Sequence, residues 1–146
     1  MFTPSQADVR RFFCSAWAKS RAGQPMDTLE QLAAGWIVEH PEWHQDFADP
    51  DAAVARVYGE GAVGANPFLH VSMHLSISEQ CSIDQPPGIR QAVELLAARR
   101  GDLHAAHHEV MECLGQMLDQ AQRAGRAPDG DAYIACVRRR ATADRL

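Results

Sequence analysis

Apolar residues recur along most of the chain at the three- and four-residue spacing that places them on one side of an α-helix. Val9, Phe13 and Trp17 form such a stripe near the N-terminus, and Leu29 and Trp36 belong to a second one. Strict alternation of apolar and polar residues, which is typical of half-buried strands, is nearly absent. The pattern therefore predicts an all-α fold.

Between residues 66 and 84 the apolar positions lie on two sides of the expected helix. Phe68 and Val71 are on one side, and Met73 and Ile77 are on the other. A helix with apolar residues around most of its circumference is usually buried on more than one side. We expect this helix to be central in the fold.

Residues that favour helix N-termini stand before these stripes. Asp27 is followed three residues later by Glu30, and Asn66 directly precedes Pro67. Short polar side chains accept hydrogen bonds from the first N–H groups of a helix, and proline fits its first turn. Thr3, Asp102 and Asp129 stand in similar positions, and together these signals predict helices over residues 4–20, 27–39, 41–47, 51–58, 66–84, 87–100, 102–124 and 129–142. We expect an up-down helical bundle in which residues 41–65 form an excursion of short helices and loop.

Length and charge restrict the class of protein. A chain of 146 residues has the usual size of one domain, so residues 1–146 are expected to form a single helical-bundle domain. The formal net charge of −5 opposes binding to nucleic acid or to an anionic membrane surface. No apolar stretch reaches the ~20 residues of a membrane-spanning helix, and the first residues lack the pattern of a secretory signal. We expect a soluble, cytoplasmic protein.

The four cysteines, Cys14, Cys81, Cys113 and Cys136, are far apart in the sequence and form no C-x-x-C pair. Disulfides are rare in a reducing compartment, so we expect four free thiols that pack as small hydrophobic residues.

The histidines are spaced in a regular way. Six of the seven fall into pairs with three residues between them: His40 with His44, His70 with His74, and His104 with His108. Random placement of seven histidines in this length gives only about 0.3 such pairs, and residues four apart share one face of a helix. Two imidazoles on one face can bind the same metal ion at ~2.0–2.1 Å.

The expected helix order brings two of these pairs to one end of the bundle. Helices 66–84, 87–100 and 102–124 are joined by short connections and should be antiparallel neighbours, so the first and third begin at the same end. Each carries its histidine pair in its first two turns. The third pair is less regular, because Pro41 disfavours helical geometry at His40, which is alternatively a cap or hinge residue.

Further ligands follow from the same helix angles. Glu112 stands one turn beyond His108, whereas Glu79 lies nearly opposite His70 around the helix axis and is not included. His107 lies in the apolar stripe and is an alternative to His108, either as a ligand or as a residue that orients one. The candidate metal ligands are therefore His40, His44, His70, His74, His104, His107, His108 and Glu112.

This donor set exceeds the four ligands of a tetrahedral zinc site, so two ions are plausible. Imidazole suits several divalent transition metals, and a carboxylate in a helical bundle favours iron or manganese. In its richness of nitrogen ligands the pattern resembles haemerythrin, which implies a di-iron centre that binds oxygen. It is also similar to the DinB-like bundles, in which three histidines hold one metal. Both likenesses concern architecture alone.

Several stretches carry a more specific resemblance, among them HPEWH, NPFLHVSMHLSISEQ and GDLHAAHHEVMECL, together with the opening FTPSQADVRRFFCSAWAKSRAGQP. They resemble a bacterial family known only as domain of unknown function 1841. The resemblance covers most of the chain and implies a short, helical, cytoplasmic protein without an assigned activity. The family commonly has glutamate where this chain has His107, which leaves the donor at that position open.

Two classes of function remain. The first is a metal-binding bundle with iron or zinc, in which iron supports redox or oxygen chemistry and zinc supports hydrolysis by lowering the pKa of a bound water. Glu39, Glu42, Glu109 and His107 are candidate general bases, but the sequence assigns no reaction. The second is a non-enzymatic interaction module with a structural zinc or no metal, which binds a protein partner or a second copy of the chain. Trp43 and Tyr58 are then the candidate anchors.

Overall fold

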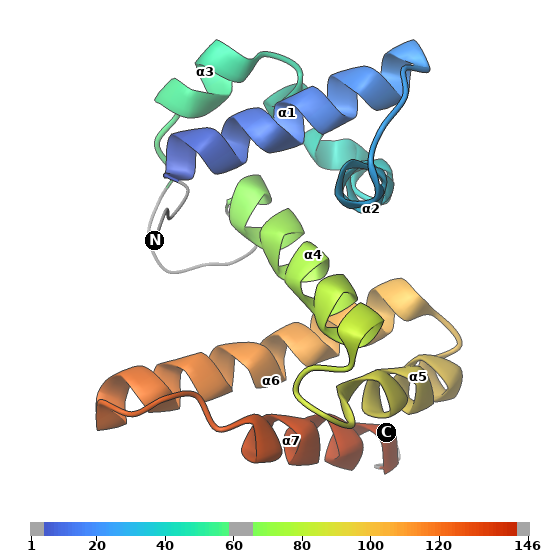
Figure 1. The fold of residues 1–146 in the computed structure, drawn as a ribbon, viewed down its shortest axis with the longest axis vertical. Coiled ribbons are helices and arrows are strands. Elements are labelled where there is room, and N and C mark those ends of the chain that lie inside the picture. The colour runs from blue at the N-terminus through green and yellow to red at the C-terminus, as the bar shows by residue number, and fades with distance from the viewer. Residues whose placement is uncertain (1–4, 59–65, 143–146) are drawn as a thin grey trace. The chain divides into compact units, whose positions relative to one another are not determined.

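The computed structural model describes residues 5–58 and 66–142, and in this part of the chain it contains helices and no strands (Figure 1). In chain order the helices are α1 (Gln6–Ala22), α2 (Thr28–Val38), the 3₁₀ helix η1 (Pro41–Phe47), α3 (Pro50–Ala55), α4 (Pro67–Ile83), α5 (Ile89–Arg100), α6 (Leu103–Ala124) and α7 (Gly130–Thr142). The predicted all-α class is confirmed, and each predicted helix has a counterpart near its expected bounds. η1 and α3 form the short-helix part of the expected excursion, whereas Thr3 and residues 59–65 lie outside the described residues.

The chain divides into two compact units, residues 1–75 and residues 76–146. The boundary falls inside α4, so this helix contributes residues to both units. Within each unit the helices pack on one another, as a helical bundle requires. The expectation of a single domain over residues 1–146 stays a prediction.

In the first unit α1 packs against α2, α3 and η1. The Ser5 hydroxyl accepts the N–H of Asp8 at 3.1 Å, and the Asp8 carboxylate accepts the N–H of Ser5 at 3.2 Å. Asp27 and Glu30 exchange the same two bonds at the start of α2, at 2.8 and 3.0 Å. Each capping box satisfies N–H groups that a helix end leaves open. The predicted cap at Asp27 is confirmed.

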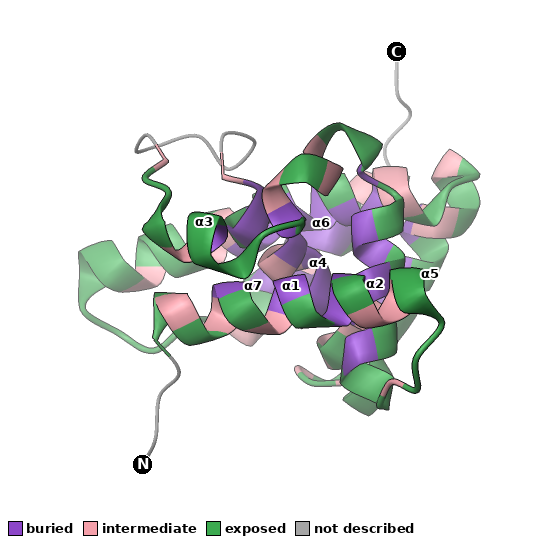
Figure 2. Ribbon diagram, turned by 90° about the horizontal axis from the view of Figure 1, so that it is seen from above, coloured by how far each residue is buried: buried purple, intermediate pink, exposed green. Residues whose placement is uncertain are grey.

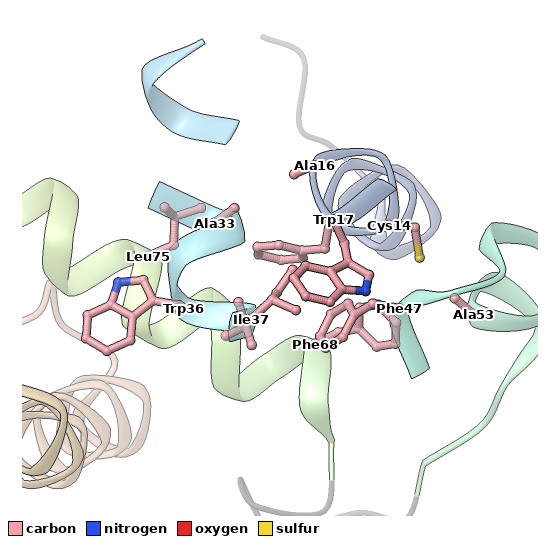
Figure 3. Close-up of a cluster of buried hydrophobic side chains, with 12 residues drawn as sticks. Cys14, Ala16, Trp17, Ala33, Trp36, Ile37, Phe47, Ala53, Phe68 and Leu75 are labelled. Carbon is pink, nitrogen blue, oxygen red and sulfur yellow. The ribbon is translucent and has the colours of Figure 1, made fainter. Parts of the chain in front are cut away.

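The core of the first unit is a cluster of buried side chains from α1, α2, η1, α3 and α4 (Figure 3). The ring of Phe47 contacts two other phenylalanines edge-on, with centroid distances of 6.4 Å to Phe13 and 4.8 Å to Phe68. The prediction that Leu29 belongs to the buried stripe is wrong, because the buried side of α2 is centred between Ala33 and Ile37 and Leu29 is 39% exposed.

α4 is buried on two sides, as its apolar pattern predicts. Val71 belongs to the core cluster of the first unit, and Ile77 lies in the part of the helix that belongs to the second unit. Both are fully buried although they point to different sides of the helix. Asn66 begins the helix, because its side-chain oxygen accepts the N–H groups of Phe68 and Leu69 at 3.1 and 3.2 Å.

In the second unit α5 packs against α6 and α7, and α6 packs against α7. Asp102 caps α6 by accepting the N–H groups of His104 and Ala105 at 3.3 and 3.1 Å. Gly101 ends α5 in the left-handed conformation, with φ of 72°, which lets α6 begin immediately afterwards. The buried residues of α6 end at Leu114, and the residues that follow are exposed or intermediate (Figure 2).

The prediction of four free thiols is wrong for two of them. Cys113 on α6 and Cys136 on α7 form a disulfide, with their Cα atoms 5.8 Å apart, whereas Cys14 and Cys81 are free. Sequence spacing concealed this pairing, because the two cysteines meet only when α6 and α7 pack together. Burial raises the pKa of both free thiols to about 11, so neither is a reactive thiolate at neutral pH.

None of the described helices combines the length with the apolar character needed to cross a bilayer.

Breaking the disulfide should destabilise the protein measurably. Its loop joins residues separated by 23 positions, and closing a loop of this size contributes about 2–4 kcal/mol to the free energy of unfolding. Urea unfolding of the Cys113→Ser/Cys136→Ser double variant should show this loss, and dithiothreitol should destabilise only the parent chain. Four titratable thiols in the denatured, unreduced protein would contradict the pairing.

Candidate metal centre

Three buried histidines come together in the first unit. His70 and His74 lie on successive turns of α4, and His40 lies between α2 and η1. The centroid of the His40 ring is 4.8 Å from that of His70 and 5.0 Å from that of His74. The three side chains are 4%, 8% and 0% exposed, respectively. Each offers a ring nitrogen, and these nitrogens lie within 4.8 Å of one another, so the trio could hold a metal ion.

The two histidines of α4 point nitrogens at each other. Nε2 of His70 and Nε2 of His74 are 3.1 Å apart. Two nitrogens bound to one ion at ~2.0–2.1 Å are separated by about 2.9 Å at right angles and about 3.4 Å at the tetrahedral angle. The observed separation lies between these values. At most one proton can lie between two such nitrogens. The same separation also fits one metal ion bound by both of them.

A backbone carbonyl determines which nitrogen of His40 is available. Nδ1 donates to the carbonyl oxygen of Trp36 at 2.7 Å. Because a carbonyl oxygen can only accept, the neutral ring carries its proton on Nδ1 and has its lone pair on Nε2. Histidine ligands are commonly oriented in this way through their second nitrogen. Pro41 keeps His40 out of helical geometry, at φ −126° and ψ 66°, and this residue precedes η1 as its N-cap.

Two indole rings fix the planes of these imidazoles. The Trp36 ring lies parallel to His74, with a centroid distance of 4.0 Å and an angle of 11°. The Trp43 ring lies parallel to His40 at 5.0 Å and 8°. Trp43 belongs to the HPEWH motif, and Trp36 precedes it. The stacking partner of Trp36 could not be predicted from spacing, because it is a residue of α4. Stacking limits how far the imidazoles can rotate.

His44 does not join the trio. Its Nε2 donates to the carbonyl oxygen of Ile37 at 2.8 Å, and its ring lies 4.4 Å from that of Trp17. The reason is helix type, because η1 is a 3₁₀ helix with three residues per turn and His40 lies outside it. Residues four apart then no longer share a face, so the α-helical spacing argument fails for this pair.

The second unit brings its own histidine pair together. His104 and His108 lie one turn apart on α6, with ring centroids 4.5 Å apart at 72°. A nitrogen of one ring lies within 4.8 Å of a nitrogen of the other. The pair is more accessible than the trio, since His104 is half-buried and His108 is exposed. The i,i+4 spacing therefore brings the rings together on α6 as it does on α4.

His107 is 2% exposed. Burial and, to a smaller extent, the charges of His104 and His108 together lower its pKa to about 4. The ring is therefore neutral at neutral pH. It does not belong to the group of histidines whose nitrogens are close enough to share an ion.

The carboxylates of α6 are held by arginines. Glu109, 4% exposed, accepts two hydrogen bonds from Arg100, at 2.6 Å from Nε and 3.2 Å from Nη2. Glu112 accepts a bond from Arg140 at 2.9 Å, and its side chain is 59% exposed. Arg100 also donates to the backbone oxygen of Arg140 at 3.0 Å. Arg100 thus binds both oxygens of Glu109, and Arg140 binds one oxygen of Glu112, so each carboxylate has a cationic partner.

Comparison with protein families finds one match. The family described as Domain of unknown function (DUF1841) matches residues 5–139, which is nearly the whole chain. Comparison with curated proteins and with solved structures finds no match.

The two ion pairs of α6 should differ strongly in their effect on stability. Glu109→Gln leaves the charge of Arg100 without its bidentate partner in a buried position, whereas Glu112→Gln removes an exposed contact. In urea unfolding we expect the first substitution to lower the free energy of unfolding several times more than the second. Equal losses would show that Glu109 does not have the structural role described above.

Proposed function

Because the chain belongs to the family described as Domain of unknown function (DUF1841), which names no activity, we propose its function from its own side chains. The protein binds a divalent transition metal through imidazoles, and the ligands are His40, His70, His74, His104 and His108. The observation that carries this proposal is the buried trio of His40, which lies between α2 and η1, with His70 and His74 on α4, where two Nε2 atoms are 3.1 Å apart.

Several features of the trio support a cation as its partner. His40 presents the lone pair of Nε2, because its Nδ1 proton is engaged by Trp36. The Nε2 atoms of His70 and His74 are 3.1 Å apart, a separation at which both can bind one ion. The parallel rings of Trp36 and Trp43 preorganise the imidazoles and keep water away from them.

Three imidazoles leave the coordination of a transition metal incomplete, since these ions take four to six ligands. His104 and His108 are the best candidates to complete it. They form the same i,i+4 arrangement on α6 that His70 and His74 form on α4. We therefore include both pairs among the proposed ligands.

The donor set favours one ion over two, and iron over zinc. Carboxylate bridges are the usual link in dinuclear iron sites, and the candidate carboxylates Glu109 and Glu112 are engaged by arginines. Five imidazoles exceed the four ligands of a zinc site. Bound iron would supply redox or oxygen chemistry at a remaining coordination position, whereas zinc would activate a water for hydrolysis.

The interaction-module hypothesis depends on Trp43 and Tyr58 as projecting anchors. Both side chains are partly buried and pack against the core of the first unit. The Tyr58 hydroxyl donates to Asp46 at 3.0 Å, and Trp43 stacks on His40. These internal contacts account for both residues, so metal binding remains the function we propose.

Single substitutions distinguish the proposed metal ligands from residues that do not bind the metal. His74→Ala should weaken metal binding by more than about 100-fold, since losing a group that merely orients a ligand already costs roughly 10–100-fold. His44→Gln and Glu79→Gln should retain the metal, because His44 is turned toward Ile37 and Glu79 is exposed. Metal content by mass spectrometry, on protein purified without a histidine tag, gives the comparison.

Two outcomes would contradict the assignment. A parent chain that is stable, contains no transition metal and takes up none on titration with Fe²⁺ or Zn²⁺ excludes the site. Equal metal loss in His44→Gln and His74→Ala excludes the proposed choice of ligands. An absorption spectrum of the metal-containing protein distinguishes iron, which gives charge-transfer bands, from zinc, which gives none.

Metal occupancy should decrease as the pH is lowered. Imidazole binds metal only when neutral, and its unperturbed pKa is about 6.5, so protons compete with the metal increasingly below that pH. Occupancy and the stability that the metal provides should be full at neutral pH and fall as the solution is acidified. Full occupancy after prolonged dialysis at about pH 4 would argue against ligation by histidine.

A further inference from the structure

A cavity of about 250 Å³ lies between α1 and the first turns of α4, within the first unit. Its polar lining comes from Gln6, Arg10, Asn66 and Ser72, and its apolar lining includes Phe68. No histidine lines it. The cavity is therefore a feature separate from the proposed metal centre.

Arg10 is the unusual residue of this lining, because its side chain is charged and only 8% exposed. Nη1 donates to the carbonyl oxygens of Ala53 and Arg56, at 2.9 and 2.6 Å. The rings of Tyr58 and Phe68 lie on the guanidinium, each with its centroid 5.3 Å from Cζ. These contacts hold the group in place and use both N–H bonds of Nη1.

The opposite edge of the guanidinium has three further N–H donors, on Nε and Nη2. Arg100 shows how this chain uses that edge, since its Nε and Nη2 both bind the carboxylate of Glu109. Among the described residues, no carboxylate forms an ion pair with Arg10, and its Nε and Nη2 have no hydrogen-bond partner. Arg10 and Arg100 are thus buried to a similar extent, but among the described residues only Arg100 has a carboxylate partner.

The acidic residue that contacts the same aromatic group does not compensate this charge. Asp46 accepts the hydroxyl of Tyr58 at 3.0 Å and pairs with Arg56 at 3.8 Å. Carbonyl oxygens and aromatic faces stabilise a cation only in part. A buried charge without a counter-ion is unfavourable, and none of the carboxylates in the described residues pairs with Arg10, so the site is suited to a bound anion.

We propose that this cavity binds a small carboxylate anion, which the Nε and Nη2 edge of Arg10 holds by two parallel hydrogen bonds. Asn66 supports it, because its Oδ1 is engaged in capping α4 and its amide nitrogen, which has no partner among the described residues, can donate. Ser72 offers a hydroxyl, and Phe68 and Leu69 provide apolar surface for a short tail. A carboxylate fits a guanidinium edge with two parallel bonds.

The size of the cavity limits the ligand. It is slightly below the ~300–1,000 Å³ of sites for drug-sized molecules, which indicates a short-chain acid. One bidentate ion pair and little apolar area support a Kd on the order of 1 mM. Butyrate and acetate are therefore suitable probes, and inorganic phosphate tests whether any anion suffices.

The experiment is titration of the full chain with each probe at constant ionic strength, followed by calorimetry and by chemical shifts of α1 and α4 in nuclear magnetic resonance. The key variant is Asn66→Asp, which keeps a residue that caps a helix well and puts a negative charge into the cavity. Gln24→Glu makes the same amide-to-carboxylate change at an exposed position outside the cavity and is the matched control.

We expect saturable binding of butyrate, with acetate weaker, and a loss of at least about tenfold in Asn66→Asp but not in Gln24→Glu. Ser72→Leu, which fills the cavity, should also abolish binding. The His74→Ala variant should bind butyrate as the parent does, which distinguishes this cavity from coordination of the carboxylate to a bound metal. Failure of the metal proposal would leave this result unchanged.

Three results would overturn the proposal. They are the absence of saturable carboxylate binding, equal binding by Asn66→Asp and the parent, and a preference for phosphate over butyrate. Folding of each variant is checked by its far-ultraviolet circular dichroism and its unfolding midpoint, so that loss of binding is not confused with loss of structure.

Discussion

The convergence of imidazoles in the first unit depends on one geometric constraint, the 3.6-residue turn of α4. It places His70 and His74 on the same side of the helix, where their Nε2 atoms approach to 3.1 Å. Every other feature of the trio adds to this arrangement. The carbonyl of Trp36 sets the tautomer of His40, Pro41 releases that residue from helical geometry, and the stacked indoles restrict the rings. Because the rings are buried and two of them are stacked on indoles, packing as well as hydrogen bonding limits their rotation.

The number of residues per helical turn also explains why His44 does not join the trio. In η1 the turn contains three residues, so His44 rotates away from His40 and donates to Ile37. On α6 the helical turn again brings His104 and His108 together. The nearby carboxylates, Glu109 and Glu112, form ion pairs with arginines. A histidine-rich donor set whose nearby carboxylates are paired with arginines is chemically different from the carboxylate-bridged sites of other helical bundles. Because of this difference, we favour a single metal ion bound by imidazole nitrogens.

Arg100 and Arg10 show how one side chain takes different roles in the two units. Arg100 is neutralised by Glu109 and links α5 to α6 and to the backbone of α7. Arg10 links α1 to carbonyl groups at the end of α3 through Nη1, and it lines a cavity. The first arrangement completes a fold internally. The second leaves a positive charge that the described residues do not neutralise, and a bound anion would compensate it.

Local sequence patterns were enough to predict the helical class, most helix boundaries and the pairing of histidines on α4 and α6, because these depend on capping residues and on spacing within one helix. Asp27, Asn66 and Asp102 cap the helices that their positions predicted. The contacts between helices became visible in the fold alone: the disulfide of Cys113 with Cys136, the stacking of Trp36 on His74, and the ion pair of Arg100 with Glu109. Such contacts join residues whose separation along the chain has no fixed period, so no local pattern encodes them. The helix type of η1 was equally hidden, since an α-helix and a 3₁₀ helix of seven residues share the same start signals.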